Sequence, residues 1–142
     1  MSERHIGFTG TQEGMSELQL KLLHDILAFA VKDGDTVVFH HGDCIGADEQ
    51  AHEIALTLNC KIHIHPPVNG SKRAFCDAWD AMYDSKPYLD RNKDIVNSSI
   101  GLIAAPKTTK EEKRSGTWST VRYATKNNKP IIILPRQLKE TV

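Results

Sequence analysis

Short apolar segments alternate with longer amphipathic segments along the whole chain, and this alternation restricts the fold more than any other feature. Five segments are expected to be strands: residues 5–10, 36–40, 61–65, 100–105 and 129–135. Helical spacing of apolar residues predicts helices between them, at residues 16–32, 46–59, 87–99 and 115–128. Near-continuous apolar strands that alternate with helices are typical of a parallel α/β sheet. The sequence therefore predicts a Rossmann-like parallel five-stranded sheet with helices on both faces and, numbering the strands along the chain, the order 3-2-1-4-5.

The residues at the ends of these segments agree with the assignment. Ser16 is expected to cap the helix that follows the first turn, and Pro87 to lie near the start of its helix. Residues 71–85 are less regular, and their spacing is compatible with one more helix. The same segment contains the run "AFCDAWDAMY", which would supply an apolar surface. We therefore expect a homo-oligomer.

Length and composition exclude several classes of protein. A chain of 142 residues with 39% hydrophobic content can bury one core, so residues 1–142 are expected to form a single domain. The 18 basic and 18 acidic side chains cancel, which argues against a nucleic-acid or membrane-surface partner. Three cysteines without paired spacing indicate neither a disulfide framework nor a zinc framework. No apolar run has the length of a signal peptide or a membrane span, so a cytoplasmic protein is expected.

The predicted order places the first and fourth strands side by side, and ligands of such sheets bind at the carboxyl ends of these strands. The turn "TGTQEG" ends the first strand, and the glycines of this region are at 7, in the strand, and at 10 and 14, in the turn. This spacing is not the G-x-G-x-x-G pattern of dinucleotide-binding proteins, and no acidic residue ends the second strand, so an NAD site is not expected. Either the turn simply needs Gly10, or the N–H groups of Gly10 and Thr11 hold an anion.

A second polar loop, "HHGDCIGAD", follows the second strand. Gly42 and Gly46 permit a tight loop, and Asp48 falls in the first turn of the next helix. Asp48 would complement the helix dipole or accept hydrogen bonds from ribose hydroxyl groups. The nearby histidines and cysteine match no known zinc spacing, and His40 and His41 point to opposite faces of a strand. We expect no metal and no resident cofactor.

Two further stretches border the same crevice. Arg91 and Asn92 precede the fourth strand, where an arginine could pair with a phosphate as a fork. Ser115, Gly116 and Thr117 open the last helix, where uncovered N–H groups favour anions. Trp118 is more readily a core or interface aromatic than a base-stacking residue.

Taken in order, "GFTGT", "HGDCIGAD", "HP" at 65–66, "RN" at 91–92 and "RSGTWSTVRYA" resemble the SLOG superfamily. This Rossmann-like group contains the DNA-processing protein A family and the LOG phosphoribohydrolases. The resemblance covers residues 6–135 and implies a nucleotide or nucleotide-derived ligand in the crevice.

One position departs from the LOG pattern. LOG enzymes carry Gly-Gly-x-Gly-Thr-x-x-Glu, whose glutamate helps to cleave the bond between base and ribose 5′-phosphate. The alignment puts Thr120 at that glutamate, and a hydroxyl group cannot replace a carboxylate beside an oxocarbenium-like centre. Glu111 and Glu112 are the carboxylates that could substitute for it.

The resemblance and its departure together predict non-catalytic binding of a nucleotide-derived signal, for sensing or sequestration. The alternative is a LOG-type hydrolase of nucleoside 5′-monophosphates with a relocated acid. The ligand-binding residues expected in either case are Thr9, Gly10, Thr11, Gly42, Asp43, Gly46, Ala47, Asp48, Arg91, Asn92, Arg114, Ser115, Gly116 and Thr117. The expected partner is therefore a small molecule.

Overall fold

The computed structural model describes residues 2–138. Its elements follow the chain in the order β1 (Glu3–Gly10), α1 (Glu17–Lys32), β2 (Thr36–His41), α2 (Ala47–Thr57), β3 (Lys61–Ile64), a short 3-10 helix (Gly70–Lys72), β4 (Ala81–Met82), α3 (Tyr88–Asn97), β5 (Gly101–Ala105), α4 (Gly116–Lys126) and β6 (Ile131–Ile133). Within this range, no helix has the length and apolar character needed to cross a membrane.

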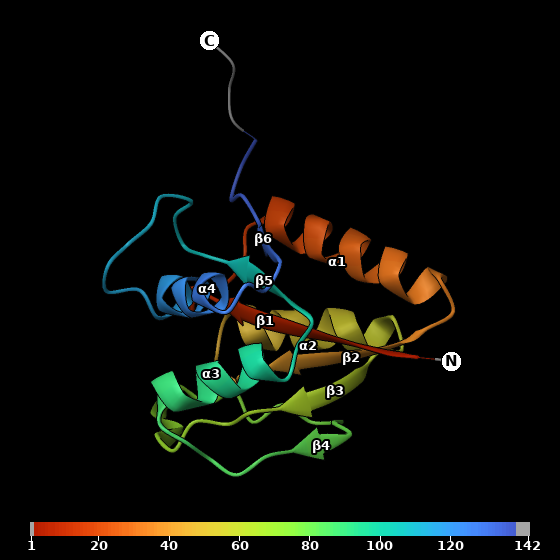
Figure 1. The fold of residues 1–142 in the computed structure, drawn as a ribbon, viewed down its shortest axis with the longest axis horizontal. Helices are drawn as coiled ribbons and strands as arrows, with labels where there is room; N and C mark the ends of the chain where they lie inside the picture. The colour runs from red at the N-terminus through yellow and green to blue at the C-terminus, as the bar shows by residue number, and fades with distance from the viewer. Residues whose placement is uncertain (1, 139–142) are drawn as a thin grey trace.

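All neighbouring strands pair in parallel, in the order β4-β3-β2-β1-β5-β6. Figure 1 shows the strands side by side, from β4 at the lower edge to β6 at the upper edge. The prediction of five strands in the order 3-2-1-4-5 is therefore wrong, because a sixth strand, β4, pairs outside β3. The five expected segments keep their neighbours, and the additional strand lengthens one edge of the sheet.

The additional strand lies inside residues 71–85, whose spacing is compatible with a helix. Residues 73–85 instead form an extended loop around β4, and both Phe75 and Ala78 have positive φ angles, of 54° and 63°. Such angles end a helix wherever they occur in a chain of L-residues. Phe75 and Trp79 remain 62% and 46% exposed, so these two aromatic side chains stay outside the core.

The helices cover both faces of the sheet because side chains alternate along the strands. On β5, Ile103 and Ala105 belong to the core beneath α1 and α2, whereas Leu102 and Ala104 belong to the core beneath α3 and α4. The ends of α1 follow the sequence closely: Ser16 is its N-cap and forms a capping box with Gln19.

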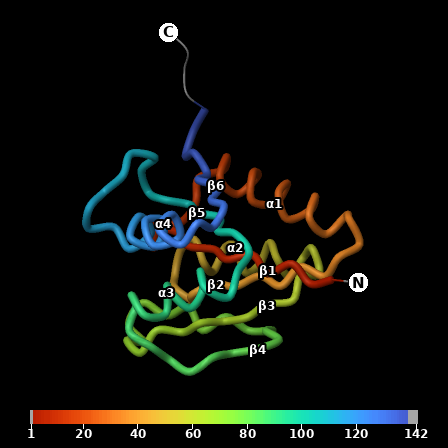
Figure 2. Tube along the Cα trace, viewed as in Figure 1, coloured from red at the N-terminus to blue at the C-terminus, as the bar shows by residue number. Residues whose placement is uncertain are grey.

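A long loop, residues 106–115, joins β5 to α4. In Figure 2 this loop extends outward from the sheet beside α4. The buried Trp118 holds this loop, because its indole N–H donates to the carbonyl oxygen of Thr108 at 3.2 Å. The expectation that Trp118 is a core aromatic is confirmed, and its position holds the loop next to the carboxyl ends of the strands.

Candidate functional site

A cleft of about 860 Å³ opens at the carboxyl ends of β1, β2 and β5. Its walls are the turn after β1, the loop after β2, one side of α3 and the start of α4. It gathers eleven of the fourteen residues expected from the sequence: Thr9, Gly10, Thr11, Gly42, Asp48, Arg91, Asn92, Arg114, Ser115, Gly116 and Thr117. Segments far apart in the chain thus meet where the parallel order predicts.

The start of α4 forms a corner suited to an anion. The Ser115 hydroxyl accepts a hydrogen bond from the N–H of Trp118 at 3.2 Å, which caps the helix. The N–H groups of Gly116 and Thr117 have no acceptor within residues 2–138, as expected for a first turn. Arg114 is exposed beside them and has no ion-pair partner in the same range. We call Arg114–Thr117 the anion corner.

The turn after β1 is more fully bonded than the sequence indicated. The N–H of Thr11 donates to Ala105 at 3.0 Å, and its hydroxyl accepts from the N–H of Glu13 at 3.1 Å. A Cβ atom on Gly10 would lie 2.5 Å from that of Ala47. The N–H of Thr11 thus joins the end of β1 to β5, and it is not free to hold an anion in this structure.

Asp48 and the anion corner reach the cleft from strands on either side of β1, since Asp48 follows β2 and the anion corner follows β5. Asp48 is 6% exposed, and its Oδ2 accepts from the N–H of Cys44 at 3.1 Å. Its Oδ1 is buried and has no partner among the described residues. Burial raises the pKa of Asp48 to about 6, although the Arg91 guanidinium opposes this rise.

Arg91, on α3, is buried, and its side chain binds other parts of the protein. Its guanidinium donates to the carbonyl oxygens of Gly42 and His65, the latter at 3.0 Å, and to Asn92 Oδ1 at 2.7 Å. A Cβ atom on Gly42 would collide with the same guanidinium. The guanidinium of Arg91 is therefore not free to pair with a phosphate as expected, because its hydrogen bonds hold the loop after β2.

Three expected residues do not line the cleft: Asp43, Gly46 and Ala47. The carboxylate of Asp43 is fully buried, accepts from Arg73 at 2.8 Å, and anchors the segment before β4. Gly46 has a φ of 86°, and a Cβ atom there would meet the backbone of Gln12. These residues shape the loop that presents Asp48, and the structure gives them no direct contact with the cleft.

Other lining residues were missed by the sequence reasoning. Tyr88 and Leu89 come from the first turn of α3, Cys44 from the loop after β2, and Lys107 from the loop after β5. The Tyr88 hydroxyl is buried and has no hydrogen-bond partner within the described part of the chain. Only the position of Lys107 directly after a core strand could have indicated its role.

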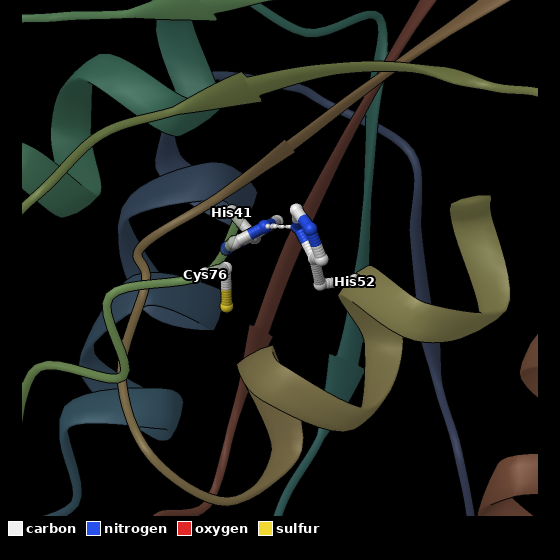
Figure 3. A group of neighbouring side chains, drawn as sticks. All are labelled: His41, His52 and Cys76. Carbon is white, nitrogen blue, oxygen red and sulfur yellow. Dashed lines mark hydrogen bonds between the residues drawn. The ribbon is translucent and has the colours of Figure 1, made fainter. Parts of the chain in front are cut away.

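One group of side chains outside the cleft has the composition of a metal site. Within residues 2–138, the ligand atoms of His41, His52 and Cys76 lie within 4.8 Å of one another (Figure 3). His41 Nδ1 accepts the N–H of Asp43 at 3.0 Å, so the proton of the neutral ring is on Nε2, which donates to His52 Nδ1 at 2.9 Å. The opposite nitrogen of a metal-bound histidine normally donates a hydrogen bond. Because His41 Nδ1 faces a donor instead, this group is better explained as a buried hydrogen-bonded pair.

No protein-family model and no curated protein matches the sequence. Solved structures do match it. The molybdenum cofactor binding protein of Rippkaea orientalis is 27% identical, with a TM-score of 0.70 over 94% of this chain and 77% of that chain. The Moco carrier protein of Chlamydomonas reinhardtii is 22% identical, with a TM-score of 0.66 over 95% of this chain and 78% of that chain. DNA processing protein A of Streptococcus pneumoniae is 17% identical, with a TM-score of 0.72 over 96% of this chain and 52% of that chain. These structural neighbours, which include a DNA processing protein A, confirm the resemblance to the SLOG superfamily that the sequence motifs indicate.

Thr120, which the resemblance aligns with the LOG glutamate, lies inside α4 and not in the cleft. It is 1% exposed, and its hydroxyl donates to the carbonyl oxygen of Gly116 at 2.9 Å. Of the two carboxylates that could substitute for a catalytic glutamate, Glu111 pairs with Arg122 at 2.8 Å, whereas Glu112 lines the cleft. Glu112 is therefore the better candidate for a relocated acid.

Proposed function

We propose that this protein binds a small, phosphorylated, nucleotide-derived molecule without cleaving it, and so senses or sequesters it. The anion corner carries the proposal. It combines two N–H groups without an acceptor in residues 2–138, the exposed Arg114 and a helix N-terminus at the edge of one large cleft. A helix N-terminus of this kind favours phosphate through its N–H groups and its dipole.

The similarity to a molybdenum cofactor binding protein and to a Moco carrier protein supports small-molecule binding as the activity. Both names describe proteins that hold a ligand. The hydrolase alternative receives less support, because Thr120 is buried and its hydroxyl is bonded to its own helix.

Two measurements test the proposal. Mass spectrometry of the native protein should find a phosphorylated small molecule that co-purifies intact. Calorimetry with AMP and GMP should then show binding that Arg114→Ala weakens by about 1.5–3 kcal/mol, the range for a charged hydrogen bond. Lys126→Ala is the matched control, since Lys126 is an exposed cation in the last turn of the same helix.

The outcomes separate the alternatives. If Arg114→Ala and Lys126→Ala bind both nucleotides as the parent does, the anion corner is not the phosphate site. Recovery of free base and ribose phosphate would favour the hydrolase. Recovery of single-stranded DNA would favour the ligand named for the Helicobacter pylori DNA processing protein A, a structure 20% identical to this chain.

A further inference from the structure

Two buried polar atoms on the walls of the cleft lack partners within the described residues: Asp48 Oδ1 and the Tyr88 hydroxyl oxygen. A buried polar group without a hydrogen bond is costly, and such groups are uncommon in native proteins. Asp48 Oδ2 is already used by the N–H of Cys44. The free oxygen therefore offers the cleft one strong acceptor, and a carboxylate cannot donate in return unless it is protonated.

The strand order places Asp48 and the anion corner on either side of β1. Asp48 follows β2 and the anion corner follows β5, and these strands are the two neighbours of β1. Adjacent strands are spaced by about 4.8 Å, so β2 and β5 themselves are roughly 10 Å apart. A ligand that contacts both Asp48 and the anion corner must therefore cross the end of β1, and it needs a spacer between its phosphate and its donor group.

The wall of the cleft that α3 forms suits a flat ring. Tyr88, Leu89 and Ile95 contribute it from α3, and Leu89 is 60% exposed. The guanidinium carbon of Arg91 lies 5.2 Å from the centre of the Tyr88 ring and helps to hold that ring in place. The cleft thus combines an anion corner, an apolar wall and a buried acceptor.

We infer that the ligand is a phosphorylated compound with a flat heterocycle whose ring or exocyclic N–H group donates to Asp48 Oδ1. This inference rests on the proposed function and specifies the ligand class of the same site. A sugar hydroxyl is the other possible donor. In a nucleoside 5′-phosphate the sugar lies next to the phosphate and the base lies further away, which suits an acceptor on the other side of β1 from the anion corner.

Asp48→Asn tests this inference because the loop determines how the new amide is oriented. The N–H of Cys44 would take the amide oxygen in place of Oδ2, which turns the NH₂ group toward the cleft. The variant therefore replaces the acceptor by a donor without changing the shape of the site. Glu49→Gln is the matched control: it removes the same charge one residue along α2, at an exposed position outside the cleft.

Calorimetry should use three probes, namely GMP, 2′-deoxy-GMP and ribose 5-phosphate. We expect Asp48→Asn to weaken GMP and 2′-deoxy-GMP by roughly 10- to 100-fold, as for a lost charged hydrogen bond. Ribose 5-phosphate should bind the parent and the variant equally, and Glu49→Gln should change none of the three. Tyr88→Phe keeps the ring wall and removes one hydroxyl, so it should produce a smaller loss that is again confined to the two nucleotides.

Each other result overturns the inference in a distinct way. Equal weakening of GMP and ribose 5-phosphate by Asp48→Asn, with 2′-deoxy-GMP unaffected, would assign the donor to the sugar. If Arg114→Ala weakens every probe while Asp48→Asn weakens none, the proposed function stands and the inference fails. If Arg114→Ala weakens none of them, the proposed function itself fails.

Discussion

At the scale of single residues, the glycines around the cleft differ in what a Cβ atom would meet. At Gly10 it would lie 2.5 Å from the Cβ of Ala47, and at Gly42 it would meet the Arg91 guanidinium. At Gly116 it would find no atom within 4 Å. Gly10 and Gly42 are therefore required by packing, whereas Gly116 leaves open space above the anion corner.

We predict that Gly116→Val separates ligand binding from folding. Its free energy of unfolding should stay within about 0.5 kcal/mol of the parent, because nothing in the described structure opposes the side chain and the position is a helix start. Its affinity for AMP should fall at least about tenfold, because the branched side chain covers the N–H groups of the first turn. Chemical denaturation and calorimetry measure the two quantities. Equal affinity in parent and variant would mean that the ligand binds elsewhere.

A second prediction at this scale concerns Asp48 and pH. Its pKa rises on folding from 3.8 to about 6, so the folded state binds the proton more tightly. This contribution to stability is present at low pH and is lost as pH rises between those two values, at a cost of roughly 3 kcal/mol above pH 6. Without ligand, Asp48→Asn should therefore be more stable than the parent by about 1–3 kcal/mol at pH 7.5, and by much less at pH 4. Urea unfolding at both values tests this, and a variant that is less stable at pH 7.5 would contradict it.

At the scale of elements, a row of histidines joins three neighbouring strands. His5 on β1 contacts His40 on β2 at 2.8 Å, and His40 contacts His65 beyond β3 at 2.9 Å between ring nitrogens. Burial, followed by the neighbouring histidines, lowers the pKa of His40 to about 3. Burial likewise lowers that of His65 to about 4, although Asp94 opposes the change. The rings of His40 and His65 are thus neutral links between strands.

This row should make the sheet sensitive to acid. The pKa of His40 is lower in the folded than in the unfolded chain, so the unfolded chain binds more protons between about pH 3 and 6.5. Stability therefore falls as pH drops through this window, by roughly 1.4 kcal/mol per pH unit for each such histidine. His40→Gln keeps one donor and one acceptor, and it should reduce the slope between pH 6 and 4.5 by about that amount. His24→Gln, on the exposed side of α1, is the control. An unchanged slope in His40→Gln would contradict the assignment.

The sequence predicted those elements whose ends are determined by neighbouring residues, and it did not predict the others. Ser16 and Pro87 mark the starts of α1 and α3 as expected, because caps act within a few residues. β4 could not be predicted, because it has two residues and pairs with β3 only after the positive φ angles of Phe75 and Ala78 redirect the chain. Hydrophobic spacing carries no signal for such angles.

At the scale of the whole molecule, the sequence indicated the place of the site better than the roles within it. The cleft lies at the carboxyl ends of β1 and β5, as the parallel order predicts. The roles of Arg91 and Asp43 could not be predicted, because residues distant in sequence, Gly42, His65 and Arg73, consume their hydrogen bonds. A homo-oligomer stays a prediction, with the exposed Phe75 and Trp79 as its surface.

The last prediction is that the molecule holds its ligand without consuming it. A ligand at 100 times its Kd stabilises the folded state by about 2.7 kcal/mol, which corresponds to roughly 5–10 °C in Tm for a domain of this size. We expect AMP at that excess to raise Tm by this amount, and the shift to be the same after overnight incubation, because no carboxylate occupies the position of Thr120. Chromatography of the same samples should find AMP and no adenine. A Tm shift that decays while adenine accumulates would identify a hydrolase. If Glu112→Gln then abolished adenine release and Glu111→Gln did not, the catalytic acid would be Glu112, the carboxylate that lines the cleft.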